Sequence, residues 1–307
     1  MDSFLAVAGQ VGVLFALMGV GAVCRIAGLI GEKAAEGMVN LLIIVVTPCL
    51  IVDVFSRPFD PSMSRGLLNA FLFACAAHCV GILLARILLR RGPDSTRRVL
   101  RMAVVFSNAG FMGIPLEHAV LGDGGVFYGA VYVAVFNLFM WSWGLRTMQG
   151  EGANFVRMLV NPGTVGLAVG LPVFFFSVRL PGAVAVPVRM IADMNTPLAM
   201  VVIGHCLAGA KLAPVARMDG AYAAAALRLV VVPAAVLAIM FPFRGSLPRE
   251  MMLALVIASS APVAAMVSML ASKYGRDIDA SVGLVSGTTL LSAFTMPVVV
   301  AVAMNLL

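Results

Sequence analysis

Apolar windows about as long as a membrane is thick fill almost the whole chain. Windows of about 20 apolar residues, the length that a helix needs to cross the hydrocarbon, occur ten times, at roughly 4–24, 36–56, 65–89, 98–121, 125–147, 161–180, 188–211, 220–241, 248–272 and 280–306. Only helices and closed barrels satisfy all their backbone hydrogen bonds inside lipid. The sequence therefore predicts an all-α polytopic membrane protein with ten transmembrane helices and no soluble domain.

Charged residues make up only 11% of the 307 residues, against about a quarter in soluble domains, and most lie in the short connections. One set of alternate connections, in which we include Arg228, carries 15 Lys and Arg, and the other set carries six. The positive-inside rule places the richer set in the cytoplasm and both termini outside it. The net charge of +7 is then a topology signal, and we expect no nucleic-acid partner. Residues 4–24 lack a basic leader and a cleavage site, so we expect them to remain as the first span.

The predicted fourth span, 98–121, is interrupted at its middle. It begins as an ordinary apolar helix and then places Ser107, Asn108, two glycines and Pro115 at mid-membrane depth. Proline lacks an amide donor and clashes with the preceding turn, so it breaks a helix at a cost of about 3 kcal/mol. Lipid cannot satisfy the freed backbone groups, so such a break must be buried in protein or line a polar cavity. We therefore predict a broken helix near Pro115 that holds a ligand.

The two halves of the chain, 1–150 and 151–307, carry matching features in the same order. Thr47 and Pro48 in the second span correspond to Thr196 and Pro197 in the seventh, and Asn40 corresponds to Asn195. The interruption of the fourth span is matched in the ninth, which reads SSAP at 259–262. Five spans per half force the halves to point in opposite directions. Inverted repeats with interrupted helices in matching positions indicate a secondary transporter whose substrate binds where the two breaks meet.

The polar residues and prolines of the four matching spans are the predicted substrate-binding residues: Ser107, Asn108, Pro115, Ser259, Ser260 and Pro262 at the breaks, and Asn40, Pro48, Asn195, Thr196 and Pro197 on the facing wall. The free amides at the start of a half-helix favour anionic groups. The alternative is that these polar residues only satisfy the disrupted backbone of the broken helices.

Other polar residues point to no second chemistry. Neither break contains Asp or Glu, so we expect no strict sodium requirement and transport that follows the substrate gradient or the proton gradient. Glu117 lies near the outer end of its span, where we expect it to be solvated, with a proton carrier as the alternative. Arg228 is expected to extend its charged group toward the cytoplasmic interface, with an anion pathway as the alternative. Cys75, His78 and Cys79 are spaced for one helix face, but packing is the preferred interpretation over a metal site. No catalytic motif is present, so we predict no enzyme and no cofactor.

The stretch 107–116, SNAGFMGIPL, resembles the Asn-x-x-x-Met/Ile-Gly-Ile-Pro-Leu segment of the auxin efflux carrier family, which includes bacterial carriers and the plant PIN-FORMED transporters. Weaker similarities lie at 40–48, 195–204 and 260–275, so the resemblance covers essentially the whole chain. The short central loop resembles bacterial members of the family, whereas plant members have a long one. Ser259 and Ser260 depart from the plant pattern.

The resemblance implies two inverted five-helix repeats, like those of bile acid and sodium/proton carriers, with the fourth and ninth helices crossing near Pro115 and Pro262. It implies elevator-type movement, a homodimer formed through the scaffold helices, and Asn108 at the position of the substrate-binding asparagine. Bacterial relatives imply a carrier of small organic anions such as malate or malonate in the inner membrane. A carrier of an uncharged or amphipathic solute, indolic or bile-acid-like, and a membrane sensor that does not translocate its ligand are the alternatives.

Overall fold

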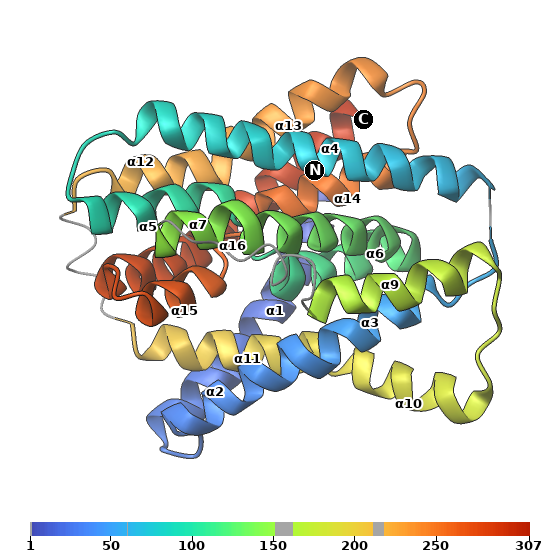
Figure 1. Ribbon diagram of the computed structural model, residues 1–307, viewed down its shortest axis with the longest axis horizontal. Coiled ribbons are helices and arrows are strands. Elements are labelled where there is room, and N and C mark those ends of the chain that lie inside the picture. Colours follow the sequence, from blue (N-terminus) through green and yellow to red (C-terminus); the bar gives the residue numbers. More distant parts are fainter. Residues whose placement is uncertain (1, 60, 151–161, 211–217) are drawn as a thin grey trace.

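The computed structural model describes residues 2–59, 61–150, 162–210 and 218–307. Within these ranges every regular element is a helix, and the one strand-like pairing is a bridge between Ser107 and Val263. Long helices lie side by side, and the connections between them gather at opposite ends of the molecule (Figure 1). The prediction of an all-α chain is confirmed for the described residues.

The first half of the chain forms α1 (Asp2–Ile26), α2 (Glu32–Leu41), the π-helix η1 (Leu42–Val46), α3 (Thr47–Phe55), α4 (Pro61–Leu88), α5 (Asp94–Val105), the π-helix η2 (Ala109–Gly113), α6 (Ile114–Phe139), the π-helix η3 (Met140–Gly144) and α7 (Leu145–Gln149). Inside α6, Gly122 has a positive φ of 66°, a conformation that glycine adopts without steric penalty. This joint separates the predicted fourth and fifth spans, which the sequence places on either side of it.

The second half forms α9 (Pro162–Phe175), α10 (Gly182–Asp193), α11 (Asn195–Ala208), α12 (Ala221–Ala226), the π-helix η5 (Leu227–Val231), α13 (Val232–Met240), the 3-10 helix η6 (Phe241–Phe243), α14 (Arg249–Ser260), α15 (Met266–Lys273) and α16 (Ile278–Leu306). Helix α10 meets α11 at Met194, and α14 is separated from α15 by five residues without helical structure. Each of the ten predicted windows contains helical residues, and described non-helical residues interrupt the windows 98–121 and 248–272 and end the window 161–180.

Seven helical runs among the described residues are long and apolar enough to cross a membrane. One of them, Ala109–Gln149, has 41 residues and contains the joint at Gly122. The interrupted helices α5, α14 and α15 fall short of a full span by themselves, and α9 is a shorter apolar helix. The structure thus establishes a multi-pass helical protein, whereas the count of ten spans in two inverted repeats remains a prediction.

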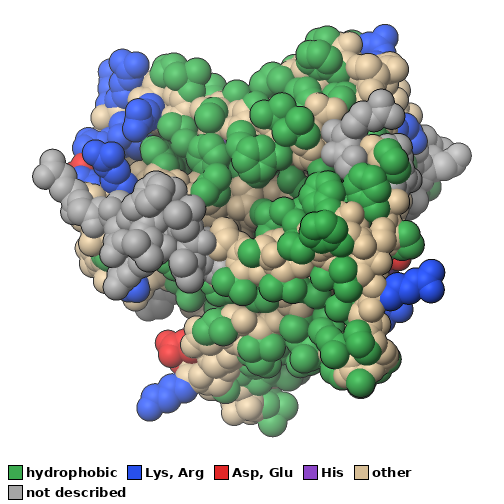
Figure 2. Space-filling view, turned by 45° about the vertical axis from the view of Figure 1, so that its right-hand side comes forward, with side chains coloured by type: hydrophobic (Ala, Val, Ile, Leu, Met, Phe, Trp, Pro, Cys, Tyr) green, Lys and Arg blue, Asp and Glu red, His purple; other side chains and the backbone are tan. Residues whose placement is uncertain are grey.

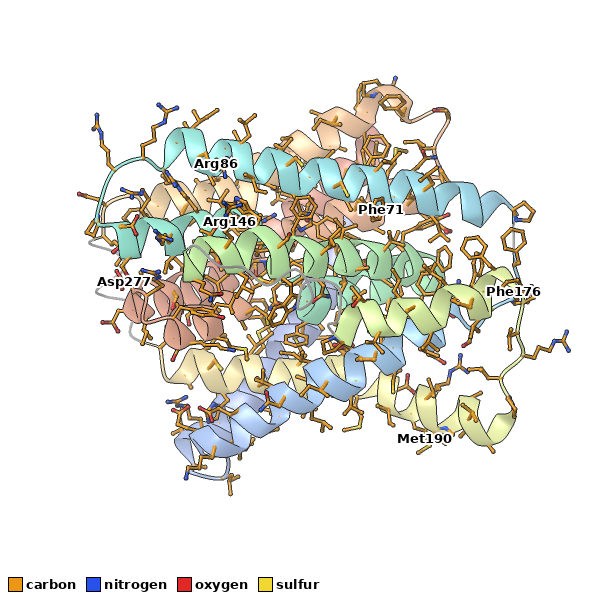
Figure 3. The ribbon with its side chains drawn as sticks, in the orientation of Figure 1. Phe71, Arg86, Arg146, Phe176, Met190 and Asp277 are labelled. Carbon is orange, nitrogen blue, oxygen red and sulfur yellow. The ribbon has the colours of Figure 1, made fainter. Side chains whose placement is uncertain are left out.

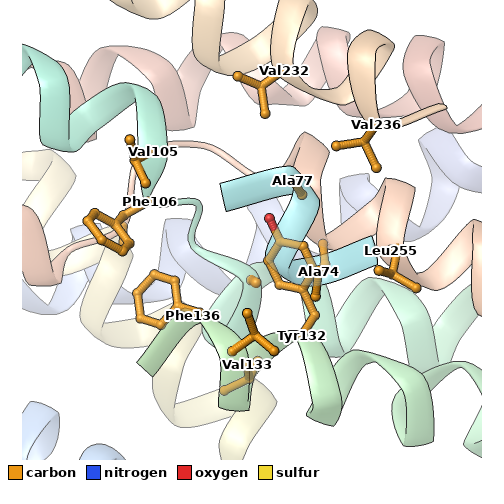
Figure 4. Close-up of a cluster of buried hydrophobic side chains, with 14 of the residues drawn as sticks. Ala74, Ala77, Val105, Phe106, Tyr132, Val133, Phe136, Val232, Val236 and Leu255 are labelled. Carbon is orange, nitrogen blue, oxygen red and sulfur yellow. The ribbon is translucent and has the colours of Figure 1, made fainter. Parts of the chain in front are cut away.

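Apolar side chains form both the interior and the outer surface. Phe106, Tyr132 and Phe136 pack with alanines of α4 and valines of α13 in the core (Figure 4). Green hydrophobic side chains also cover the middle of the outer surface, with Lys and Arg at its margins (Figure 2). Figure 3 shows Arg86, Arg146 and Asp277 toward one end of the molecule and Phe176 at the other. This distribution suits a protein whose sides contact lipid and whose ends contact water.

Candidate substrate site

Two helices of the bundle are interrupted at the same place. Helix α5 ends at Val105, and helical structure resumes with η2 at Ala109; α14 ends at Ser260, and α15 begins at Met266. The first interruption lies at residues 106–108, before Pro115, and Pro115 is the second residue of α6, which continues η2 without a break. The predicted break near Pro115 is therefore displaced by several residues: the backbone leaves the helical conformation at 106–108, and the helix that follows continues through the proline.

The extended segments between the half-helices cross and pair with each other. The backbone amide of Asn108 donates to Pro262 O (2.7 Å), and the amide of Ala264 donates to Phe106 O (3.0 Å). Thr288 Oγ1 of α16 accepts from the amide of Val263 (3.1 Å). Backbone groups that lipid would leave unsatisfied thus satisfy one another or a neighbouring hydroxyl. The crossing is a fixed structural unit that joins the two halves of the chain.

On one side of the crossing, the C-terminal ends of α5 and α14 meet a single buried arginine. Arg228 of η5 has no solvent exposure, and its Nη1 donates to the carbonyls of Val104 (2.9 Å) and Val105 (3.1 Å). Its Nη2 donates to the carbonyl of Ser259. A helix C-terminus carries partial negative charge on its free carbonyls, so a guanidinium between two such ends is favourable.

On the other side, the N-terminal ends of the half-helices border a small cavity of about 60 Å³. Gly110 and Phe111 of η2 and Ala265 and Met266 at the start of α15 line it. The first amides of a helix have no intrahelical acceptor and carry partial positive charge. The polar side chains on the walls are Thr47, Ser107, Asn108, Asn137 and Trp141, and none of them is an acid or a base.

A larger cavity of about 310 Å³ adjoins the same break. Asn108, Phe111 and Ala265 border both cavities, so Asn108 lies between them. The far end of the larger cavity is lined by Arg25 and Glu32, which form an ion pair with each other. Hydroxyls of Ser268, Ser286 and Thr289 lie along its walls. The crossing is therefore bordered by a mainly apolar cavity that carries three hydroxyls on its walls and the Arg25–Glu32 ion pair.

Two comparisons with known proteins bear on this arrangement. A family model described as a membrane transport protein matches residues 6–158 and 154–300. The chain belongs to this family. An uncharacterized transporter of Methanothermobacter thermautotrophicus is 26% identical over 298 residues, which cover 90% of this chain and 92% of that protein. The resemblance to auxin efflux carriers is thereby confirmed, and the protein is a multi-pass membrane protein of a transporter family.

In this transporter, the structure brings several of the predicted residues together at the crossing. Asn108 and Ser107 border the cavities, and Pro262 supplies the carbonyl that holds the Asn108 amide. Asn195 of α11 lies close by, where its Nδ2 donates to Gly110 O at 3.4 Å. Pro115 is buried two residues after the end of η2. These residues keep their predicted relation to one site, and their contact with substrate stays a prediction.

Other predicted residues lie away from both cavities. The hydroxyls of Ser259 and Ser260 donate to carbonyls of their own helix, Val256 O (3.0 Å) and Ile257 O (2.8 Å). Both serines therefore serve the backbone of the interrupted helix in this structure. Asn40 is exposed, because the same helical run turns Leu42 and Val46 toward the core.

The remaining members of the facing wall divide in the same way. Pro48 packs against Gly166 of α9, while its neighbour Thr47 reaches the small cavity. Pro197 is exposed and Thr196 is half-buried, and neither lines a cavity. Of these residues, only Thr47 lines a described cavity.

The structure places Arg228 at the crossing, and it adds Asn137 and Trp141 to the lining of the small cavity. Arg228 neither extends to the interface nor lines a cavity, so both interpretations made of it are wrong; its place at the crossing also removes it from the charges that report topology. Asn137 and Trp141 lie one helical turn apart at the end of α6 and the start of η3, and both face the small cavity. Their spacing of four residues inside an apolar span is a signal that could have found them.

Two side chains that the sequence analysis considered have different surroundings from those expected. Glu117 is fully buried, so its predicted solvated position is wrong. His78 is buried among aromatic rings and stacks on Phe139, with 5.0 Å between the two ring centroids, while Cys79 is exposed. Within the described residues no group of three His, Cys, Asp or Glu side chains is placed to hold a metal ion.

Proposed function

We propose that this protein is a secondary transporter of small organic anions, such as the carboxylates malate and malonate. The observation that carries the proposal is that both half-helix N-termini border one cavity whose walls hold neutral donors and no carboxylate. Free amides at helix N-termini bind anions without a basic side chain. Asn108, Ser107 and Trp141 are placed to donate hydrogen bonds to a bound carboxylate.

The alternating-access part of the proposal is an elevator in which the crossing moves against a scaffold. Two helix contacts support it: α1 packs on α11, and α3 packs on α9. In the repeat of the halves 1–150 and 151–307, α1 corresponds to α9 and α3 corresponds to α11, so each contact is the counterpart of the other. This is the pattern that an inverted repeat produces. The scaffold would comprise these four helical regions, and a homodimer through their exposed apolar faces would hold it still in the membrane.

The larger cavity supports an assignment of the conformation. It extends from Asn108 to Arg25 and Glu32, at the connection that the charge distribution assigns to the cytoplasm. We assign the structure to an inward-facing state, with both termini outside the cytoplasm of a bacterial cell.

One observation favours a second candidate, a carrier of an amphipathic solute such as an indolic compound. Phe111, Val133 and Phe136 give the small cavity a mainly apolar wall, and the indole of Trp141 offers a ring to stack on. A sensor that binds its ligand without moving it would use the same residues. These alternatives differ from the anion carrier in the charge moved and in whether any flux occurs.

Uptake of radiolabelled malate and malonate into proteoliposomes tests the proposal. We expect saturable uptake of at least one carboxylate, accelerated by a membrane potential that is positive inside the compartment that receives the anion. An uptake rate that does not change with the membrane potential, together with inhibition by indolic compounds, would favour the amphipathic carrier. A thermal shift on carboxylate binding without any flux would favour the sensor and contradict transport.

A further inference from the structure

One carboxyl group of the membrane interior has no partner. Glu117 of α6 has no solvent exposure, and neither Oε1 nor Oε2 accepts or donates a hydrogen bond within the described part of the chain. Its carboxyl lies against Gly129: a Cβ atom added to this glycine would be only 1.6 Å from Oε2 of Glu117. A Cβ atom added to Gly113 would be 3.7 Å from Oε1. The site is closed around the carboxyl by glycines, which leave room for it and supply no charge.

An ionised carboxylate in such a place is strongly unfavourable. Removing a carboxylate from water without pairing it costs so much free energy that the group takes up a proton instead. Charged side chains inside membrane proteins normally face a partner or a water-filled cavity. Glu117 has neither in this conformation, so its neutral, protonated form is the one that fits the structure.

Glu117 also lies on a helical segment between two departures from helical geometry. The interruption at residues 106–108 precedes the segment, and Gly122, with its positive φ, follows it. The helical residues between them, 109–121, begin directly after Asn108 at the crossing, and η2 and α6, which contain them, both pack against α14. Movement of the crossing would therefore shift this segment relative to Gly129 and change the surroundings of the carboxyl.

We propose that Glu117 is a proton-binding site that couples transport to the proton gradient. In the present conformation the carboxyl O–H bond is intact; in the alternate conformation the segment exposes the carboxyl, the bond breaks, and the proton passes to water. Return of the segment to its buried position requires the carboxylate to take a proton from water first. The coupling rests on the proposed transport cycle, whereas proton binding by Glu117 does not.

Titratable groups around Glu117 are sparse. The helices packed against α6 carry, among described side chains, Cys24, Arg25, Cys49, Asp53, Cys75, His78, Cys79, Arg86, His205, Cys206, Arg249 and Glu250. Arg25 is paired with Glu32, and Asp53 lies 3.8 Å from Arg189, away from Glu117. Glu250 of α14 lies beside Gly124, two turns along α6 from Glu117. On α6 itself, His118 faces Asp123, and Tyr132 is the group near enough to interact electrostatically with Glu117.

Infrared spectroscopy of the purified protein at pH 8 tests proton binding without any substrate. Exposed Asp and Glu side chains, with pKa values of about 4, are ionised at this pH. We expect wild type to show the carbonyl band of a protonated carboxyl, Glu117→Gln to lack it, and the exposed control Glu250→Gln to keep it. Glu117→Asp should retain a band at a shifted frequency. A wild-type spectrum without the band, or a band unchanged in Glu117→Gln and Glu117→Asp, would overturn the proposal.

Proteoliposomes with radiolabelled malate as the probe test the coupling. We expect an imposed pH gradient to change wild-type and Glu250→Gln flux several-fold and to leave Glu117→Gln flux unchanged, while exchange of labelled for unlabelled malate continues in all three. An equal response to the gradient in Glu117→Gln and wild type would contradict coupling through this residue. A wild type that binds a proton but moves no malate would instead count against the proposed substrate.

Discussion

The two sides of the helix crossing are both formed by the ends of interrupted helices, but one side is filled by an arginine side chain and the other borders a cavity. Each interrupted helix produces one C-terminal end with partial negative charge and one N-terminal end with partial positive charge. The chain fills the C-terminal side with Arg228, which is fully buried and donates to three carbonyls. It leaves the N-terminal side open to a cavity lined by neutral polar groups.

This difference indicates how a membrane protein can keep broken helices and still bind a ligand. Unsatisfied backbone carbonyls would destabilise the crossing in every state, so a permanent cation stabilises them. The free amides on the other side need an acceptor only some of the time, which a substrate can supply. One side of the crossing is therefore structural and the other functional, and substitutions on the two sides should have different consequences.

The largest effect is expected at Arg228. In Arg228→Met, a side chain of similar length without charge leaves three buried carbonyls unpaired, and we expect a loss of about 3–5 kcal/mol of stability, comparable with the loss of one partner from a buried ion pair. Arg228→Lys should recover only part, because a single ammonium does not span both helix ends. Melting temperatures in detergent measure both, with the exposed Arg146→Met as control. A melting temperature of Arg228→Met equal to that of the control would contradict the structural role.

Asn108 should respond in the opposite way. Asn108→Ala removes a side chain that borders both cavities, so we expect little change in melting temperature. A hydrogen bond to a charged group contributes about 1.5–3 kcal/mol, so carboxylate affinity should fall about 10- to 150-fold. Calorimetric titration with malate on the same preparation as the melting curve gives both values. An unstable variant with normal affinity would mean that Asn108 only supports the broken backbone.

Thr288 offers a finer test of the structural side. Thr288→Val keeps the shape of the side chain but removes the oxygen that accepts from the Val263 amide, and a buried unsatisfied donor costs about 1–3 kcal/mol. The neighbouring Thr289→Val is the matched control, because the Thr289 hydroxyl donates only to Val285 O of its own helix. We expect a lower melting temperature for the first variant than for the second. Equal melting temperatures would show that the amide finds another acceptor.

The smallest effect is expected at Trp141. Its Nε1 is buried and has no acceptor among the described residues, which suits a donor reserved for a ligand. Trp141→Phe removes a neutral hydrogen bond, worth about 0.5–1.5 kcal/mol, so affinity should fall about 2- to 12-fold. Trp143→Phe makes the same chemical change at a residue that packs on Phe106 and lines neither cavity. An equal loss in both variants would remove Trp141 from the site.

The sequence predicts the helices and the place of the interruptions well, because both depend on local composition. Twenty apolar residues in a row specify a span, and Ser107, Asn108 and the following glycines specify a break. The predicted position of the break is displaced by several residues, because the helix is interrupted at 106–108 and continues through Pro115. Asn108 borders both cavities, and its polar amide inside an apolar window is the local signal that predicts a site there.

Burial against distant elements could not be read from the sequence. Arg228 lies near the predicted cytoplasmic end of its span, and its position between Val105 and Ser259 depends on the crossing of two remote segments. Glu117 lies near the outer end of its span, yet Gly129 and the packing of α14 on α6 enclose it. Asn40 and Ser259 are predicted at the site because their side chains are polar. In the structure, however, Asn40 is on the exposed face of its helix, and the Ser259 hydroxyl donates to a carbonyl of its own helix.

One pair of substitutions tests the central contrast most directly. Ser107→Cys and Ser259→Cys make the same small change on opposite sides of the crossing, in a background without the five native cysteines. With a water-soluble thiol reagent we expect Ser107→Cys to react and malate to slow the reaction, at concentrations that also saturate transport, while Ser259→Cys stays unreactive with or without malate. Labelling of Ser259→Cys that malate prevents, with Ser107→Cys unaffected by malate, would contradict the account.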